Sequence, residues 1–246
     1  MDWQAWLGTA WPRGWEIIGS GGKTTFMSGW AAQLGAEGKN VIYTTSTHLA
    51  AASPLYPGRI VEGEDLERAR QEWIASPQPR LWGLRRLSPQ GKWLGYSPQE
   101  LEEIAAWPGL DHLLVEADGS RGLPLKAHAM YEPVLYPSAQ LGVAVLGLSG
   151  LGRAVVEGEV HRPQLLERLL GCEPGAIIGC RELVTIAWSY LNELDTPYKL
   201  LVLSQAQSWE MEYLYHLAKL IVEAEPPAQH LAIMAQSPGE WRPLWP

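Results

Sequence analysis

The sequence predicts an α/β protein built on a mostly parallel sheet with helices on both faces, and three observations support this. Short apolar or β-branched runs alternate with stretches whose apolar residues recur at three- and four-residue steps. One apolar run, residues 113–115, suits a strand buried on both faces. A glycine-rich turn joins the first apolar run to the first helical pattern. The length of 246 residues fits a single domain over residues 1–246.

The alternation of strands and helices continues along the chain after a short arm at residues 1–14. Strands are expected at residues 15–18, 40–45, 59–61, 113–115, 141–148, 198–203 and 231–234. Helices are expected at residues 24–37, 64–75, 98 onward, 164–170, 181–191 and 209–223. Residues 79–96 differ, because two apolar runs flank a Ser-Pro-Gln-Gly turn at 88–91. We interpret this segment as a small β-hairpin insertion.

The turn after the first strand has the composition of a phosphate-binding loop. Glycines allow successive backbone N–H groups to point at a phosphate, and the following helix N-terminus adds partial positive charge. The loop reads G-x-x-G-K-T from Gly19, shorter than the usual G-x-x-x-x-G-K-[ST] because Ile17 replaces the first glycine. The residues expected to bind the phosphates are Gly19, Ser20, Gly21, Gly22, Lys23, Thr24 and Thr25. The alternative is an ordinary glycine-rich strand-to-helix turn.

A phosphate loop of this kind is typical of P-loop NTPase-like proteins, in which a nucleotide binds together with Mg²⁺. The Lys23 ammonium would contact the β- and γ-phosphates, and the Thr24 hydroxyl would hold the metal. Glu116 and Asp118, at the end of the expected strand at 113–115, are the best acidic partners. Period-two alternation sends both carboxylates to the same side of the strand. The alternative is that one caps a turn and the other makes a structural ion pair.

Two basic residues, Arg121 and Lys126, follow on a loop that contains glycine and proline. Such a loop can move over bound phosphates, and either cation would then stabilise charge during phosphoryl transfer. Lys23, Glu116, Asp118, Arg121 and Lys126 are therefore the catalytic candidates. The alternative is a solvated loop in which Arg121 only neutralises one of the two carboxylates.

Further polar residues stand where ligands bind in open α/β sheets, at the carboxyl ends of strands. Thr45, Thr47 and His48 follow the second expected strand, and His161 with Arg162 precedes a helix, where an anion is favoured. A lone histidine is more often structural, so these residues are secondary candidates.

Composition excludes several classes of function. The formal net charge is −8 without a basic block, which disfavours a nucleic-acid-binding surface. Residues 1–15 lack a signal-peptide pattern, and no apolar run approaches the length of a membrane span. The two cysteines, Cys172 and Cys180, have no metal-site spacing. We therefore expect a cytoplasmic protein with no nucleic-acid or membrane partner.

The nucleotide base is not specified by any guanine-recognition pattern. P-loop enzymes specific for guanine usually carry Asn-Lys-x-Asp after a late strand, and residues 204–207 read Ser-Gln-Ala-Gln instead. ATP is therefore favoured over GTP.

With these segments in view, the chain resembles the YqeC-type accessory proteins of selenium-dependent molybdenum hydroxylases. The resemblance rests on residues 18–25, 41–48 and above all 114–126, whose Glu-Ala-Asp-Gly-Ser-Arg-Gly-Leu-Pro-Leu-Lys string is specific. Residues 132–134 and 160–162 also match, and the resemblance fades after them. It implies a nucleotide-dependent protein that assists maturation of a selenium- or molybdenum-containing hydroxylase, with that enzyme or its cofactor-maturation proteins as partners.

The expected function is thus a Mg²⁺-dependent NTPase with ATP or GTP as its nucleotide. Two other functions stay open. The short loop also resembles that of Mur-type ATP-dependent ligases, which favours a ligase or kinase. A protein that binds a phosphate-bearing cofactor of the molybdopterin type without hydrolysis would use the same loop.

Overall fold

A computed structural model describes residues 11–47, 56–89, 93–225, 230–237 and 240–245. The strands are β1 (Gly14–Ser20), β2 (Val41–Thr45), β3 (Arg59–Glu62), β4 (Leu81–Leu87), β5 (Trp93–Leu94), β6 (His112–Glu116), β7 (Leu141–Gly147), β8 (Tyr198–Ser204), β9 (Leu231–Ser237) and β10 (Glu240–Trp245). The helices are α2 (Lys23–Ala36), α3 (Leu66–Ala75), α4 (Pro98–Ala105), α5 (Pro163–Leu170), α6 (Cys180–Glu193) and α7 (Met211–Ala224), with a 3₁₀ turn, η1 (Leu148–Gly150), after β7.

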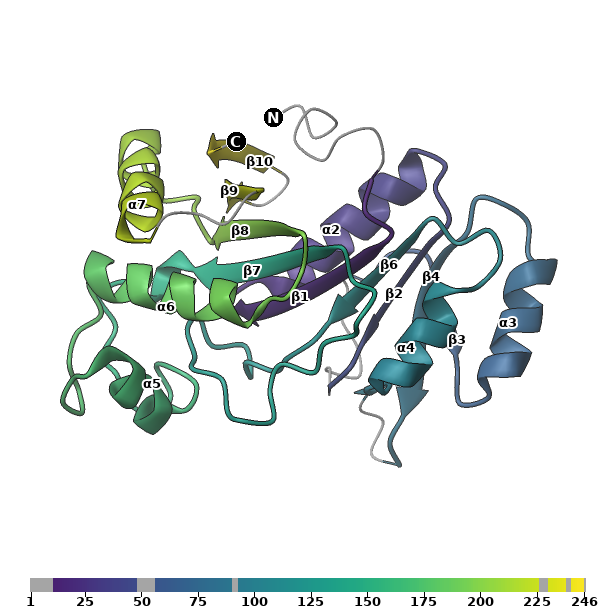
Figure 1. Cartoon of the computed structure of the whole chain (residues 1–246), viewed down its shortest axis with the longest axis horizontal. Helices are drawn as coiled ribbons and strands as arrows, with labels where there is room; N and C mark the ends of the chain where they lie inside the picture. The colour runs from purple at the N-terminus through teal and green to yellow at the C-terminus, as the bar shows by residue number, and fades with distance from the viewer. Residues whose placement is uncertain (1–10, 48–55, 90–92, 226–229, 238–239, 246) are drawn as a thin grey trace.

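The strands form a sheet in the order β10-β9-β8-β7-β1-β6-β2-β4-β3, with β5 attached to β4 (Figure 1). Neighbours from β3 to β9 along this order are parallel, so the predicted mostly parallel sheet is confirmed. β10 pairs antiparallel with β9 at the edge and is absent from the sequence prediction. β1 lies between β6 and β7, which places the end of the first strand at the centre of the sheet.

The hairpin interpretation of residues 79–96 is correct only at one end of that segment. β4 pairs with β5 through Arg86 and Leu87, as a hairpin requires. The rest of β4 is an internal strand that pairs parallel with both β2 and β3. The segment is therefore part of the main sheet rather than an insertion. Its two-residue partner, β5, contributes the fully buried Trp93 to the core beside α2.

Helices cover both faces of the sheet, as predicted, but unequally. Side chains alternate along β1, so Trp15 and Ile17 pack with α2 while Ile18 packs with α6 and α7. α3 and α4 pack on the Ile18 side through the neighbouring strands, because Ile42 and Leu113 join their cluster. Among the described helices, α2 therefore covers one face of the sheet. Helices α3, α4, α6 and α7 cover the opposite face.

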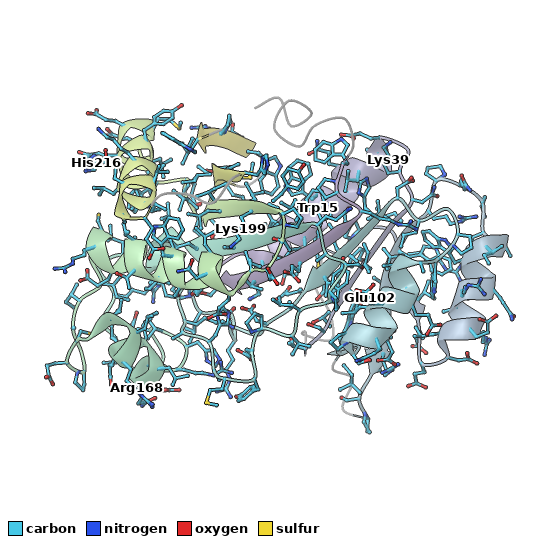
Figure 2. All side chains as sticks on the ribbon, in the orientation of Figure 1. Trp15, Lys39, Glu102, Arg168, Lys199 and His216 are labelled. Carbon is cyan, nitrogen blue, oxygen red and sulfur yellow. The ribbon has the colours of Figure 1, made fainter. Side chains whose placement is uncertain are left out.

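Aromatic side chains supply much of the core beside α2. Trp15 and Trp30 are 1% exposed, and their ring centroids lie 5.6 Å apart. The Trp241 ring of β10 lies 5.7 Å from the Trp30 ring between centroids, so the antiparallel β9–β10 pair at the sheet edge covers this core. Trp15 is labelled in Figure 2. Burying an aromatic side chain contributes on the order of 2–3 kcal/mol. The tryptophan-rich composition is thus partly explained by packing.

The predicted start of α4 is also confirmed. Ser97 and Glu100 form a reciprocal capping box at the start of α4, with Pro98 in its first turn. Within the described part of the chain, every helix is too short or too polar to cross a bilayer.

Candidate phosphate-binding site

The glycine-rich turn between β1 and α2 has a backbone that only glycine adopts readily. Gly19 and Gly21 have φ of +96° and +79°. A Cβ at Gly19 would lie 2.3 Å from the Val145 carbonyl oxygen, and one at Gly21 would lie 2.8 Å from the Pro124 oxygen. The strand–loop–helix arrangement that the sequence predicts is therefore formed, and its neighbours leave no room for side chains.

Hydrogen bonds hold this loop from two sides. The Ser20 hydroxyl donates to the Pro124 carbonyl oxygen at 2.9 Å and lies 3.0 Å from the Tyr190 hydroxyl. On the other side, the Ser204 hydroxyl at the end of β8 donates to the Gly21 carbonyl oxygen at 2.6 Å. Ser204 stands at the start of the segment that lacks a guanine-recognition pattern, and it positions the loop instead.

Lys23 is buried at the first position of α2 and faces both predicted carboxylates. Its Nζ donates to the Gly19 carbonyl oxygen at 2.7 Å and lies 3.0 Å from Asp118 Oδ1 and 3.6 Å from Glu116 Oε1. Glu116 and Asp118 therefore point to the same side of the β6 end, as the period-two argument predicts. Burial opposes the charge on Lys23, but the two carboxylates outweigh it and raise its pKa.

Thr24 and Glu116 form the pair best suited to a hard cation. The Thr24 hydroxyl donates to Glu116 Oε2 at 3.0 Å, which places two hard oxygen atoms beside the glycine loop. Burial raises the pKa of Glu116, an effect that Lys23 only partly offsets. Mg²⁺ is usually held by one or two such oxygens plus phosphates and water, so these residues fit the ion. Thr25, by contrast, is exposed on α2.

The described residues contain no group of three or more His, Cys, Asp or Glu side chains arranged to hold a metal.

Asp118 is the centre of a dense cluster of donors. Its Oδ2 accepts the Gly19 backbone N–H at 2.7 Å, lies 2.8 Å from Lys126 Nζ and contacts His128 Nε2. Burial would raise its pKa, but Lys23, His128 and Lys126 reverse that effect and hold the pKa well below its usual range. Asp118 is therefore charged at neutral pH although the residue is fully buried.

Lys126 is buried in ion pairs rather than carried on an open loop. Its Nζ contacts Asp118 and lies 3.1 Å from Glu132 Oε2, and it also donates to the Gly119 carbonyl oxygen at 2.9 Å. Glu132 in turn accepts hydrogen bonds from Arg162 at 2.6 and 3.0 Å. The expectation that Lys126 moves over a phosphate requires both ion pairs to break, so its catalytic role stays a prediction.

Arg121 lies apart from this cluster. It is exposed, with φ of +52°, in the turn where the Leu123 N–H donates to the Ser120 carbonyl oxygen. Within the described ranges, no hydrogen bond or ion pair engages its guanidinium. Arg121 therefore does not neutralise Glu116 or Asp118 in this structure.

The other candidates fall into two groups. The Thr45 hydroxyl donates to the backbone oxygen of Glu116 at 2.8 Å and accepts from the Thr47 N–H at 3.0 Å, so both threonines fix the end of β6. His48 lies outside the described residues. His161 and Arg162 lie beside Lys126, because Lys126 and His161 form a parallel bridge.

Sequence reasoning missed several members of the cluster. His128 Nδ1 lies 2.5 Å from Glu193 Oε2, and the Tyr190 hydroxyl donates to the Lys126 carbonyl oxygen at 2.9 Å. Nothing in the local sequence separates His128 from the other histidines, since its partners come from distant segments. For Glu132 the sequence offers one indication, because it lies in residues 132–134, which are among the segments that resemble the YqeC-type proteins.

Comparison with known proteins tests the resemblance that the sequence segments indicate. The family model described as YqeC protein matches residues 16–164, which include the glycine loop, both carboxylates and Arg162. The chain belongs to the YqeC family. A YqeC-family relative, the uncharacterized protein YqeC of Escherichia coli (strain K12), is 32% identical over 171 residues. That match covers 70% of this chain and 66% of the relative, just under two thirds of its length. No solved structure matches the chain.

Proposed function

We propose that this YqeC-family chain binds a nucleoside triphosphate with Mg²⁺ at the glycine loop and hydrolyses it. The observation that carries the proposal is the convergence of Lys23, Thr24 and Glu116 at one end of that loop. A cation for phosphate, a hydroxyl and a carboxylate for metal, and backbone N–H groups at a helix N-terminus are the parts that phosphoryl transfer requires.

Each residue has a distinct task in this proposal. The backbone N–H groups of residues 20–23 bind the phosphate oxygens, because the Gly19 N–H is already donated to Asp118. The Lys23 ammonium turns from Asp118 and Glu116 toward the β- and γ-phosphates. Thr24 and Glu116 hold Mg²⁺, which supplies charge neutralisation on the phosphates. Asp118 keeps its ion pair with Lys126 and thereby stays charged without a metal.

The biological role is proposed from the resemblance. A nucleotide-dependent protein of this kind would assist maturation of a selenium- or molybdenum-containing hydroxylase in the cytoplasm, in contact with that enzyme or its cofactor-maturation proteins. ATP is preferred over GTP because residues 204–207 lack the guanine pattern. The Thr24–Glu116 pair favours a Mg²⁺-dependent reaction over metal-independent binding of a phosphate-bearing cofactor.

The test is calorimetric titration of ATP, GTP, CTP and a molybdopterin nucleotide, each with and without Mg²⁺, into wild-type protein and two lysine variants. We expect Lys23→Ala to lower nucleotide affinity by about 100-fold or more, because a charge-assisted contact to phosphate is lost in a buried site. Lys219→Ala is the matched control, since Lys219 is an exposed lysine on α7 that pairs with Glu223.

Equal nucleotide affinities for wild type and Lys23→Ala would reject the loop as the binding site. Phosphate release that requires an added acceptor would favour the ligase or kinase. Binding of the molybdopterin nucleotide alone, without dependence on Mg²⁺, would favour the non-hydrolysing binder.

A further inference from the structure

We propose that Arg121, His161 and Arg162 form a second anion-binding site, which receives the phosphate or carboxylate group of a small second ligand beside the nucleotide. This inference rests on the proposed function, because the nucleotide beside which the second ligand would bind is part of that proposal. The site itself is argued from side chains that the phosphate loop does not use.

The backbone brings these residues together around Lys126. The His161 N–H donates to the Leu125 carbonyl oxygen at 2.9 Å, and Lys126 and His161 form a parallel bridge. Arg162 follows with φ of +59°, at the residue before α5, and its guanidinium returns to Glu132. The segment that carries Arg121 and the segment that carries Arg162 therefore meet at Lys126.

This part of the molecule has a surplus of positive charge. The cations are Lys23, Lys126, Arg121, Arg162 and His128, whose pKa Asp118 and Glu193 raise despite burial, which makes five. The carboxylates among them are Glu116, Asp118, Glu132 and Glu193, which are four. The chain as a whole has a formal net charge of −8. A local cationic surplus in an acidic protein is where a small anion is attracted, whereas a long polyanion would be repelled by the remaining surface.

His161 is the side chain that points most directly to a ligand. It is 8% exposed, and within the described ranges its ring makes no hydrogen bond. Burial and the nearby Arg162, Lys126 and Arg121 lower its pKa to about 4. The imidazole is therefore neutral at pH 7 and keeps one ring N–H that can donate a hydrogen bond to an oxyanion.

Arg121 has both the freedom and the space to take part. Its guanidinium is without a hydrogen bond or ion pair across the described parts of the chain, and it is exposed. A Cβ placed at Gly119 or at Gly122 would meet no atom within 4 Å, so open space flanks the arginine on both sides. Arg162 already donates to Glu132 from both terminal nitrogens, so it contributes positive charge beside the site, and Arg121 supplies the guanidinium that is unpaired among the described residues.

The contacts of Asp118 relate the proposed second site to the phosphate loop. Asp118 contacts Lys23 through Oδ1 and Lys126 through Oδ2, so one buried carboxylate separates the loop cation from the second cluster. An anion held by Arg121 and His161 would thus lie on the far side of Asp118 from the nucleotide phosphates. A second ligand with an anionic group would approach the nucleotide from this side.

The test uses Lys23→Ala protein, so that the phosphate loop does not compete for the probe. Inorganic phosphate and succinate are titrated separately and followed by calorimetry. We expect Arg121→Gln and His161→Leu, each added to this background, to weaken binding of the preferred probe by about tenfold, the loss of one charge-assisted or buried hydrogen bond. Arg168→Gln is the matched control, because Arg168 is an arginine on α5 at the outer edge of the molecule (Figure 2).

Equal probe affinities for Arg121→Gln, His161→Leu and the Arg168→Gln control would overturn the proposal. A preference for phosphate over succinate would identify a phosphate-bearing ligand, and the reverse preference a carboxylate. If Lys23→Ala lowers stability too far, the same titrations are made in wild-type protein saturated with MgADP. Failure of wild type to bind nucleotide, with Arg121-dependent anion binding intact, would reject the proposed function and leave the second site standing.

Discussion

Glu116 and Asp118 are two carboxylates on one side of one strand end, and the structure treats them differently. Both are buried and both face Lys23. Asp118 also contacts Lys126, His128 and a backbone N–H, and its pKa is lowered, whereas the pKa of Glu116 is raised by burial. Asp118 is therefore a permanent charge with its partners already present. Glu116 is a carboxylate whose charge lacks a sufficient partner.

Burial alone therefore does not decide the protonation state of a carboxyl group. The number of donors that reach each oxygen decides it. A carboxylate with too few donors gains from an added cation, and one with a complete set does not. We therefore propose Glu116 rather than Asp118 as the metal ligand, because Asp118 already has its partners within the cluster.

The largest effect is expected for Asp118→Asn. Removing the charge leaves Lys126 and Lys23 buried with fewer partners, which costs about 3–5 kcal/mol of unfolding free energy. Glu116→Gln is the matched comparison and should cost less than about 1 kcal/mol, because its surroundings do not favour the charged form. Urea denaturation at pH 7 measures both. Similar losses for the two variants would contradict the distinction.

The stability loss of Asp118→Asn should also depend on pH. Because the folded-state pKa of Asp118 lies below its ordinary value of 3.8, its contribution is present above pH 4 and is lost as pH falls below it. The stability difference between wild type and Asp118→Asn should therefore shrink between pH 5 and pH 3. A constant difference over that range would show that the loss arises from packing instead.

Glu16 of β1 provides the limiting case, a buried carboxylate with no ion pair among the described residues. It is 1% exposed, and burial raises its pKa from 4.5 to about 8, an effect that a backbone hydrogen bond with Tyr136 only reduces. Since the folded-state pKa is the higher one, stability is greatest below pH 4.5 and falls as pH rises to 8. Relative to wild type, Glu16→Gln should gain on the order of 1 kcal/mol per pH unit across pH 5–8.

Urea denaturation at several pH values between 5 and 9 checks this expectation. Glu67→Gln on α3 is a suitable control because Glu67 is exposed and makes only local contacts. If the advantage of Glu16→Gln does not grow with pH, the carboxyl group has a cationic or hydrogen-bonding partner in solution that keeps it charged.

The smallest effect is expected for the metal dependence of nucleotide binding. Glu116→Gln should raise the Mg²⁺ concentration needed for half-maximal ATP binding by about tenfold, because one charged oxygen ligand is lost. Asp118→Asn, studied at a temperature where it stays folded, should leave that concentration nearly unchanged. The reverse result would assign the metal to Asp118.

Much of the fold could be predicted because its determinants are local. The strand–glycine–helix sequence at residues 15–37 and the Ser97 capping box specify their own geometry. The placement of β4 inside the main sheet was not predictable in the same way. It depends on register with β2 and β3, which the local hairpin pattern does not contain.

The site residues likewise fall into those that local sequence predicts and those that depend on the folded chain. Lys23, Thr24 and Glu116 come from motifs with fixed spacing, and alternation along β6 placed the two carboxylates correctly. The contacts of Lys126 with Glu132, and of His128 with Glu193, join segments without a shared pattern. Arg121 and Lys126 looked equivalent on one loop, but only the folded chain shows that one is paired and the other is not.

The hydrogen bonds from Ser20 and Ser204 have a consequence for how a ligand is received. They tie the glycine loop to Pro124 and to β8 in the protein by itself. The conformational entropy of ordering this flexible segment is therefore lost when the chain folds and is not lost again on binding. In the proposed phosphate site the backbone is therefore preorganised, and the adjustment that remains for binding is the rotation of the Lys23 side chain.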